Sequence, residues 1–315
     1  MRKILICWFE FWFGLNDKHN LKYRMPWLWV VCGVNWKIAS FLFNKLLDLD
    51  AFFGLYPHAS LNSASDVIVS MTSYPGRINS VWKAVDSIFY QKEKPQLICL
   101  YLSEEEFPNR RADLPQRLLG YEKLGLKILF REHNLMAHNK YYYAFREYPK
   151  KLIITIDDDF YYSTNLISNL LDIHKTYPDS ICSNTLHVIT FSLTQKFLPY
   201  SQWSQRLINQ LPSHLNLALG YNGVLYPRFD YNKDFFDMNL IKELSLKADD
   251  LWLKANEIVN NIKVANGKYL CAGIEVGGSQ VISLSKSNIV KNENDIQWGK
   301  LCEHFHISYN NFFDE

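Results

Sequence analysis

From Asp66 onward, short apolar runs alternate with stretches in which apolar residues recur at helical spacing. Apolar runs of this length, bounded by polar or turn residues, are typical of buried strands. The stretches between them place apolar residues on one face, as Ala84, Val85 and Ile88 do. The pattern predicts strands over 67–71, 97–102, 126–130 and 152–156, and helices from about 80, near 114–119, over 140–147 and from a cap at Thr164 to 176. This alternation predicts a Rossmann-like α/β fold, a mainly parallel sheet flanked by helices.

The pattern weakens after residue 180. A strand is predicted over 183–191, and residues 192–218 give no clear prediction. Residues 219–227 contain glycines and aromatic residues, a composition typical of a loop near a ligand. A helix begins at Ala248, with acidic Asp249 and Asp250 in its first turn, where they suit the helix dipole. Short strands are predicted over 271–276 and 280–284.

The strand Leu152–Ile156 is followed directly by Asp157, Asp158 and Asp159. In open α/β sheets, ligands bind at the carboxyl ends of the strands. Three adjacent carboxylates repel one another, and a hard divalent cation such as Mg²⁺ or Mn²⁺ would relieve that repulsion. A solvated turn that caps the next helix is the alternative interpretation.

Residues 1–60 differ from the rest of the chain, and five of the nine tryptophans fall within the first 36 residues. The apolar stretch Trp27–Leu47 is interrupted by polar residues and is too polar to predict a spanning helix. Aromatic residues together with lysine suit a helix that lies on a membrane surface. Seven basic against four acidic residues favour an anionic leaflet weakly. Packing on the remaining chain or in a homodimer is an equal alternative.

Composition narrows the function classes. With 315 residues and 48% apolar residues, the chain can bury a sizeable core. A net charge of +2 does not suggest nucleic acid as a partner. The six cysteines show no zinc spacing and are expected to be free thiols, in a reducing, cytoplasmic setting.

Three features stand in order: a polar loop with Arg77 after the first strand, Asp157-Asp158-Asp159 after a middle strand, and Asp249-Asp250 at the start of a helix. Together they resemble the GT-A fold glycosyltransferases, more closely the inverting family 2 group and related bacterial surface-polysaccharide enzymes. The resemblance covers roughly residues 66–260. Together with the distinct composition of the first 60 residues, it divides the chain into an N-terminal aromatic and basic helical segment over 1–60, a GT-A catalytic domain over 61–290 and a C-terminal tail over 291–315 that closes the active site.

The resemblance also implies a donor site. The family's DxD motif binds a divalent metal, Mn²⁺ or Mg²⁺, that bridges the diphosphate of a nucleotide-sugar. Asp159 and Asp157 would be the metal ligands, with Asp157 and Asp158 facing the nucleotide. The remaining donor-binding residues would be Thr72, Tyr74, Arg77, Asn139 and Lys140, where Tyr74 stacks on a base and Arg77 reaches a phosphate. A surface salt bridge is the alternative role of Arg77.

The acceptor side follows from the same resemblance. Asp250 would be the general base, and Asp249 would orient it or hold the acceptor. The loop at Gly220, Tyr221, Asn222 and Gly223 would contact the sugar and acceptor. In some GT-A enzymes a C-terminal histidine completes the metal site, and His304 and His306 are the candidates, with His306 preferred. His138 and His174 are expected to be structural.

The resemblance departs from processive synthases, because no Gln-x-x-Arg-Trp signature follows the acids. It implies a single-addition inverting transferase that uses a nucleotide-sugar, most often a UDP-sugar, and a glycan or lipid-linked acceptor in capsule or O-antigen type synthesis. The expected location is cytoplasmic, on the inner face of the membrane. Two alternatives are a sugar nucleotidyltransferase, which the single Gly76 after the first strand matches poorly, and a non-catalytic membrane-associated scaffold.

Overall fold

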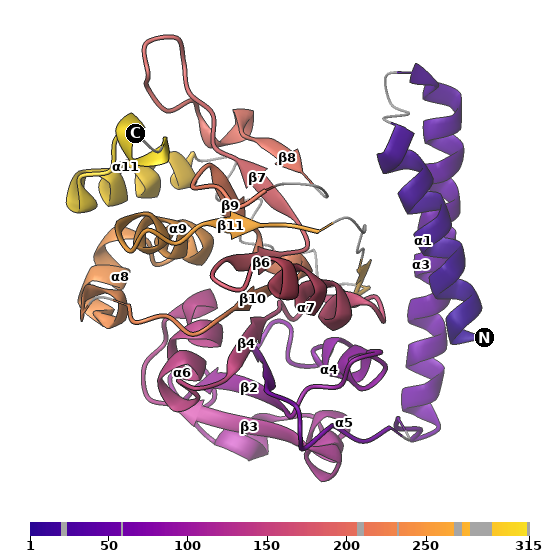
Figure 1. The fold of residues 1–315 in the computed structure, drawn as a ribbon. Coiled ribbons are helices and arrows are strands. Elements are labelled where there is room, and N and C mark those ends of the chain that lie inside the picture. The colour runs from indigo at the N-terminus through magenta and orange to yellow at the C-terminus, as the bar shows by residue number, and fades with distance from the viewer. Residues whose placement is uncertain are drawn as a thin grey trace.

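A seven-stranded sheet forms the centre of the molecule (Figure 1). The computed structural model describes residues 1–19, 24–57, 59–206, 211–231, 233–267, 273–277 and 292–313. The strand order is β11-β6-β10-β4-β1-β2-β3. The strands are β1 (Val67–Thr72), β2 (Leu97–Ser103), β3 (Leu126–Arg131), β4 (Leu152–Thr155), β6 (Ile181–Ser183), β10 (Val224–Tyr226) and β11 (Val264–Ala265).

The sheet is mainly parallel, as the sequence predicts. β1 pairs in parallel with β2 and with β4, β2 pairs in parallel with β3, and β6 with β11. β10 is the exception and runs antiparallel to both β4 and β6. It lies inside the stretch 219–227 that was predicted to be a loop, and that prediction is wrong for these three residues. A strand of three residues is too short to show an alternating pattern.

Successive side chains of each strand point to opposite faces of the sheet. Both faces carry apolar side chains, and helices cover each of them. Val67, Val69 and Met71 of β1 belong to one apolar core, and Ile68 belongs to the other. The first core is covered by α4 (Trp82–Phe89), α5 (Gln116–Leu119), α7 (Leu166–Thr176) and the N-terminal helices. The second is covered by α6 (Asn139–Glu147), α8 (Met238–Leu244), α9 (Asp249–Val259) and α11 (Glu293–Phe305).

Two smaller sheets and several single turns complete the fold. β7 (Leu186–Val188) pairs with β8 (Ser204–Arg206) and β9 (Asn216–Ala218), and β5 (Phe160–Tyr161) pairs with β12 (Ile274–Glu275). The 3₁₀ turns are η1 (Arg110–Asp113), η2 (Gly120–Leu124), η3 (Met136–His138), η4 (Tyr200–Gln202), η5 (Gly220–Asn222), η6 (Lys233–Phe236) and η8 (Tyr309–Phe312).

Three sequence predictions need correction here. The strand predicted over 183–191 is divided between β6 and β7, which lie in different sheets. α7 is preceded by Asn165, which makes no side-chain capping bond, so Thr164 is not its cap. Of the strands predicted over 271–276 and 280–284, the structure describes β12, and residues 271–272 and 280–284 lie outside the described residues.

The structure agrees with the expectations for several cysteines and for His174. Cys32, Cys99 and Cys182 are buried free thiols, as predicted, while Cys271 lies outside the described residues. His174 is half-buried on α7, as expected for a structural histidine.

Two N-terminal helices, α1 (Arg2–His19) and α3 (Pro26–Phe52), pack against each other along one side of the molecule (Figure 1). We call this pair the N-terminal hairpin. α3 is long and apolar enough to cross a membrane by length and composition, and 17% of its apolar window is buried.

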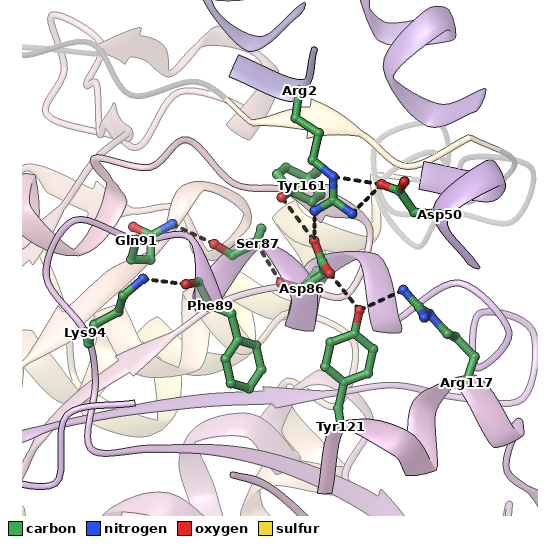
Figure 2. Close-up of polar contacts among 11 residues, drawn as sticks. Arg2, Asp50, Asp86, Ser87, Phe89, Gln91, Lys94, Arg117, Tyr121 and Tyr161 are labelled. Carbon is green, nitrogen blue, oxygen red and sulfur yellow. Dashed lines mark hydrogen bonds and ion pairs between the residues drawn. The ribbon is translucent and has the colours of Figure 1, made fainter. Parts of the chain in front are cut away.

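A buried carboxylate joins the hairpin to the sheet domain (Figure 2). Asp86 of α4 has no exposed surface and accepts a hydrogen bond of 2.8 Å from Arg2. It also accepts hydrogen bonds from Tyr121 (2.7 Å) and Tyr161 (3.1 Å). Arg2 reaches back to Asp50 of α3 through its Nε and Nη2 atoms. Because buried charges need partners, this network fixes the position of the hairpin on the domain.

Candidate functional site

The predicted acidic motifs meet at one edge of the sheet. Asp157 to Asp159 follow β4, and the loop after β1 lies beside them because β1 and β4 are parallel neighbours. β10 runs the opposite way, so its first residue, Val224, pairs with Thr155 at the end of β4. The loop before β10, residues 220–223, therefore lies at the same edge. The antiparallel strand that the sequence did not reveal is what brings this loop to the acids.

Asp158 is held by the loop after β1. It is 5% exposed, and its carboxylate accepts hydrogen bonds from Ser73 Oγ (2.5 Å) and Arg77 Nη1 (2.7 Å). Arg77 Nη1 also lies 3.1 Å from Asp159 Oδ2. Burial raises the pKa of Asp158, and Arg77 and Ser73 oppose that rise. Arg77 thus neutralises two acids of the motif, and its predicted contact with a phosphate stays a prediction.

Lys140 connects the two acidic motifs. Its Nζ lies 2.6 Å from Asp157 Oδ1 and 2.9 Å from Asp249 Oδ2, and the residue is 3% exposed. Ser70 of β1 donates a hydrogen bond to the carbonyl oxygen of Lys140, which fixes the first turn of α6 on the sheet. Burial lowers the pKa of Lys140, but the charges of Asp157 and Asp249 outweigh it and raise the pKa well above its usual value. Lys140 therefore stays charged at the centre of the site.

Asp249 and Asp250 differ in protonation behaviour. Burial raises the pKa of Asp249, but the charge of Lys140 outweighs it and holds the pKa below its ordinary value. Burial and then the charge of Asp249 raise the pKa of Asp250 well above its usual range. The backbone N–H of Gly220 points at the Asp250 carboxylate, 3.2 Å from Oδ1 and 3.4 Å from Oδ2. Neighbouring acids with diverging pKa values are typical of catalytic pairs.

Glycine is required in the loop before β10. A Cβ at Gly220 would lie 2.8 Å from Lys140 Nζ and 3.3 Å from Asp250 Oδ1. Gly223 has a φ of +85°, which L side chains rarely adopt. The ring of Tyr221 lies 5.6 Å from that of Phe160, directly after the acidic motif. Asn222 is buried and donates to Thr185 Oγ1 (3.0 Å), so its amide supports the loop from beneath.

Three predicted donor residues make contacts within the protein. Thr72 Oγ1 donates to the carbonyl of Tyr101 (2.8 Å). The Tyr74 ring lies 5.7 Å from the Arg77 guanidinium carbon. Asn139 is 2% exposed, and its Oδ1 accepts from the backbone of Leu135 (3.2 Å). Their contacts with a donor stay predictions.

His138 is structural, as expected. It is completely buried, with Nδ1 2.7 Å from the Tyr141 hydroxyl and Nε2 2.8 Å from the Ser245 carbonyl oxygen. Burial lowers the pKa of His138 to about 4, so the ring is neutral at physiological pH. A neutral ring with both nitrogens bonded links η3 to the segment before α9.

The acids suit a divalent cation. Burial and then the charge of Asp157 raise the pKa of Asp159 to about 7, so these two carboxylates repel each other in a confined space. Within the described residues, no group of three or more His, Cys, Asp or Glu could hold a metal ion. Mg²⁺ is commonly bound by one or two carboxylates plus substrate phosphates, so Asp157 and Asp159 fit a cation that arrives with a diphosphate. His304 and His306 are exposed at the end of α11, and a metal contact of either stays a prediction.

Sequence reasoning missed three residues at this edge. Ser73 could have been found, because a hydroxyl directly follows a strand that neighbours the acidic one. Tyr162 accepts from the Asp157 backbone N–H (2.8 Å) and donates to the Asp157 carbonyl (2.9 Å), which fixes the turn. For Tyr200, burial and then the charges of Asp250 and Asp249 raise the pKa. Tyr162 and Tyr200 carry no sequence signal of these roles.

Comparisons with known proteins return distant structural similarities. No protein-family model and no curated protein sequence matches the chain. Among solved structures, TarS 1–349 of S. aureus matches at 14% identity and a TM-score of 0.40, covering 65% of this chain and 59% of that one. The chain therefore spans less than two thirds of that structure's length.

Two further similarities are of the same order. The mannosyltransferase PcManGT from Pyrobaculum calidifontis, in complex with GDP-Man and Mn²⁺, matches at 10% identity and a TM-score of 0.46, covering 83% of this chain and 72% of that one. The CMP:2-keto-3-deoxy-manno-octonic acid synthetase complexed with CTP matches at 9% identity and a TM-score of 0.40, covering 72% and 98%. Similarities at this level assign no activity to the chain.

Proposed function

We propose that the protein is an inverting glycosyltransferase that transfers one sugar from a nucleoside diphosphate sugar to a glycan or lipid-linked acceptor in surface-polysaccharide synthesis. One observation carries the proposal. Five carboxylates of two acidic motifs, Asp157 to Asp159 and Asp249-Asp250, gather around Arg77 and Lys140 at the ligand-binding edge of the sheet. Perturbed carboxylates in such a position are typical of functional sites.

The donor side is built on the first motif. Asp157 and Asp159 would hold a divalent cation, Mn²⁺ or Mg²⁺. The cation would neutralise the negative charge that develops on the departing diphosphate. Ser73 and Arg77 hold Asp158 in place, and Lys140 fixes the orientation of Asp157. We expect a UDP-sugar as the donor, with its base against Tyr74.

The acceptor side is built on the second motif. Asp250 takes the proton of the acceptor hydroxyl as that oxygen forms a bond to C1 of the sugar, and the bond from C1 to the diphosphate oxygen breaks on the opposite face. The diphosphate leaves with the electron pair, so the configuration at C1 inverts. The raised pKa of Asp250 supports this role, because a base is more effective when its pKa lies nearer the working pH. Asp249, paired with Lys140, orients its neighbour.

The proposed substrates indicate where in the cell the enzyme would act. Nucleotide-sugars are cytoplasmic substrates, and a lipid-linked acceptor lies on the membrane. We therefore propose a cytoplasmic enzyme with a peripheral contact to the inner face of the membrane.

Product analysis tests the reaction. The full chain and the Asp250→Asn variant are incubated with a panel of UDP- and GDP-sugars, and separately with nucleoside triphosphates and sugar phosphates, with and without Mn²⁺. Release of a nucleoside diphosphate that requires wild-type Asp250 supports the proposal. Release of pyrophosphate from a nucleoside triphosphate and a sugar phosphate would instead identify a nucleotidyltransferase, and no turnover with any donor would support a scaffold.

A further inference from the structure

The N-terminal hairpin presents an apolar stripe to the outside. On α3 its members recur every three or four residues as far as Leu42, and after the exposed Lys45 the same helix face continues with Leu49 and Phe52. They are between 39% and 82% exposed, and they are Trp27, Val30, Val31, Val34, Ile38, Phe41, Leu42, Leu49 and Phe52. α1 adds the exposed side chains Ile4 (70%) and Phe11 (61%). An exposed apolar surface of this length on one element marks an interaction site.

The opposite face of α3 turns toward the protein and carries the buried residues Cys32, Ala39, Phe43 and Leu47. Two polar side chains of the hairpin bond to the rest of the protein. Asn44 bonds to the backbone of Glu275 (3.0 Å) and of Gly277 (2.9 Å). Glu10 of α1 accepts a hydrogen bond from Ser163 (2.6 Å). The hairpin therefore packs on the domain through apolar residues and polar bonds, and it also leaves apolar side chains on its outer face, where a helix that faces water would carry polar ones.

The acids of α3 are all neutralised by cations of this protein. Asp48 pairs with Lys83 (2.7 Å), and Asp50 pairs with Arg2, which in turn holds the buried Asp86 (Figure 2). Between Pro26 and Leu47 the sequence contains no acidic residue, and its charged residues are Lys37 and Lys45, both exposed. The outer surface of this segment is thus apolar and basic, which complements a surface that is apolar and anionic.

We propose that this stripe docks the protein on an anionic lipid bilayer, with α3 lying in the plane of the membrane interface. The positions of the lysines favour an α3 that lies in the membrane interface and not an α3 that crosses the membrane. α3 is long enough to span, but Lys37 falls near its middle, where burial in the bilayer centre is costly. In the interface plane, Lys37 and Lys45 extend to the lipid phosphates while their methylene stems cover apolar surface. The inference deepens the proposed location, and it rests on the proposed function only for the lipid-linked acceptor.

Vesicle binding tests the proposal. The full chain is sedimented with vesicles of phosphatidylcholine alone and with vesicles that also contain phosphatidylglycerol. We expect binding to the anionic vesicles and weaker binding to the neutral ones. The double variant Val34→Glu/Ile38→Glu should bind at least about tenfold more weakly, because two apolar contacts with lipid are replaced by charges. Lys37→Gln, which removes one positive charge, should weaken binding by roughly fivefold, and only to the anionic vesicles.

A matched control separates docking from general loss of apolar surface. Leu193→Glu/Ile296→Glu changes two exposed apolar residues elsewhere (105% and 57% exposed) and should leave vesicle binding unchanged. Thermal unfolding and nucleotide binding of each variant show whether the fold and the donor site are intact, so failure of docking is distinguished from failure of the transferase proposal. Wild-type protein that stays in the supernatant with both vesicle types would overturn the inference. A lipid-free dimer that Val34→Glu/Ile38→Glu dissociates would overturn it in favour of a second copy.

Discussion

Two buried clusters of charge differ in how completely their acids are neutralised. At the base of the hairpin, the single carboxylate of Asp86 accepts hydrogen bonds from Arg2, Tyr121 and Tyr161. At the edge of the sheet, five carboxylates surround two cations, and burial and Asp157 raise the pKa of Asp159 to about 7. A satisfied network stabilises one arrangement of the fold, whereas an excess of buried negative charge is costly unless a ligand compensates it. The contrast indicates a structural role for the first cluster and supports the binding role that we propose for the second.

Removing the proposed base gives the largest expected effect. Asp250→Asn keeps the shape of the side chain and its bond with the Gly220 N–H, but an amide cannot take the acceptor proton. We expect kcat of sugar transfer to fall by about 10²–10⁴-fold, with thermal stability retained. Asp172→Asn, an exposed acid paired with Lys175, is the matched control and should transfer at the wild-type rate. A loss smaller than tenfold in Asp250→Asn would remove this residue from the role of base.

Substitution in the Asp86 cluster should lower the stability of the protein, whereas substitution in the acidic cluster at the sheet edge should not. Asp86→Asn removes the buried charge that Arg2, Tyr121 and Tyr161 bond to, while Arg2 keeps its pair with Asp50, so we expect the free energy of unfolding to fall by about 1–3 kcal/mol. Asp159→Asn, at the binding cluster, should not lower it, because the change removes a repelling carboxylate. Chemical denaturation of both variants measures the difference. A drop in Asp159→Asn as large as that in Asp86→Asn would contradict the division of roles.

His138 is a buried residue of the binding region whose two ring nitrogens both have hydrogen-bond partners, and its pKa can be tested. Burial lowers its pKa from 6.5 to about 4, so between these values the unfolded chain binds more protons than the folded one. Stability therefore rises with pH through this window and is lost as the pH falls. We expect this histidine to contribute about 2 kcal/mol to the change between pH 5 and pH 7. Denaturation of His138→Gln at both pH values should show a pH dependence smaller by that amount, and an unchanged dependence would mean that folding does not lower the pKa of this ring.

Sequence reasoning predicted the parts of the fold whose signals are local. The strands β1 to β4 and the helices α6 and α9 each carry an apolar pattern long enough to recognise, and their predicted positions agree closely with the structure. β10 and the division between β6 and β7 depend on pairing partners far along the chain, and three residues hold no period. The topology of these strands therefore depends on long-range pairing, which the local sequence pattern does not predict.

The site shows the same limit. The two acidic motifs are visible as runs of aspartate after a strand and before a helix. Their connection through Lys140, and the opposite pKa directions of Asp249 and Asp250, depend on which side chains meet in three dimensions. Arg77 is a further case. Its pairing with Asp158 and Asp159 carries no sequence signal, and the phosphate contact that the family resemblance implies stays a prediction.

The most direct test of the binding role is thermal unfolding with nucleoside diphosphates, with and without Mn²⁺. A ligand that binds only the folded state stabilises it by about 1.4 kcal/mol at ten times its dissociation constant. We predict that UDP or GDP raises the melting temperature of the wild type only with Mn²⁺, that Asp159→Asn abolishes the rise, and that Asp86→Asn keeps it from a lower starting value. A rise that persists in Asp159→Asn, or no rise with any nucleotide, would contradict the claim that the excess acids at the sheet edge form a cation and nucleotide site.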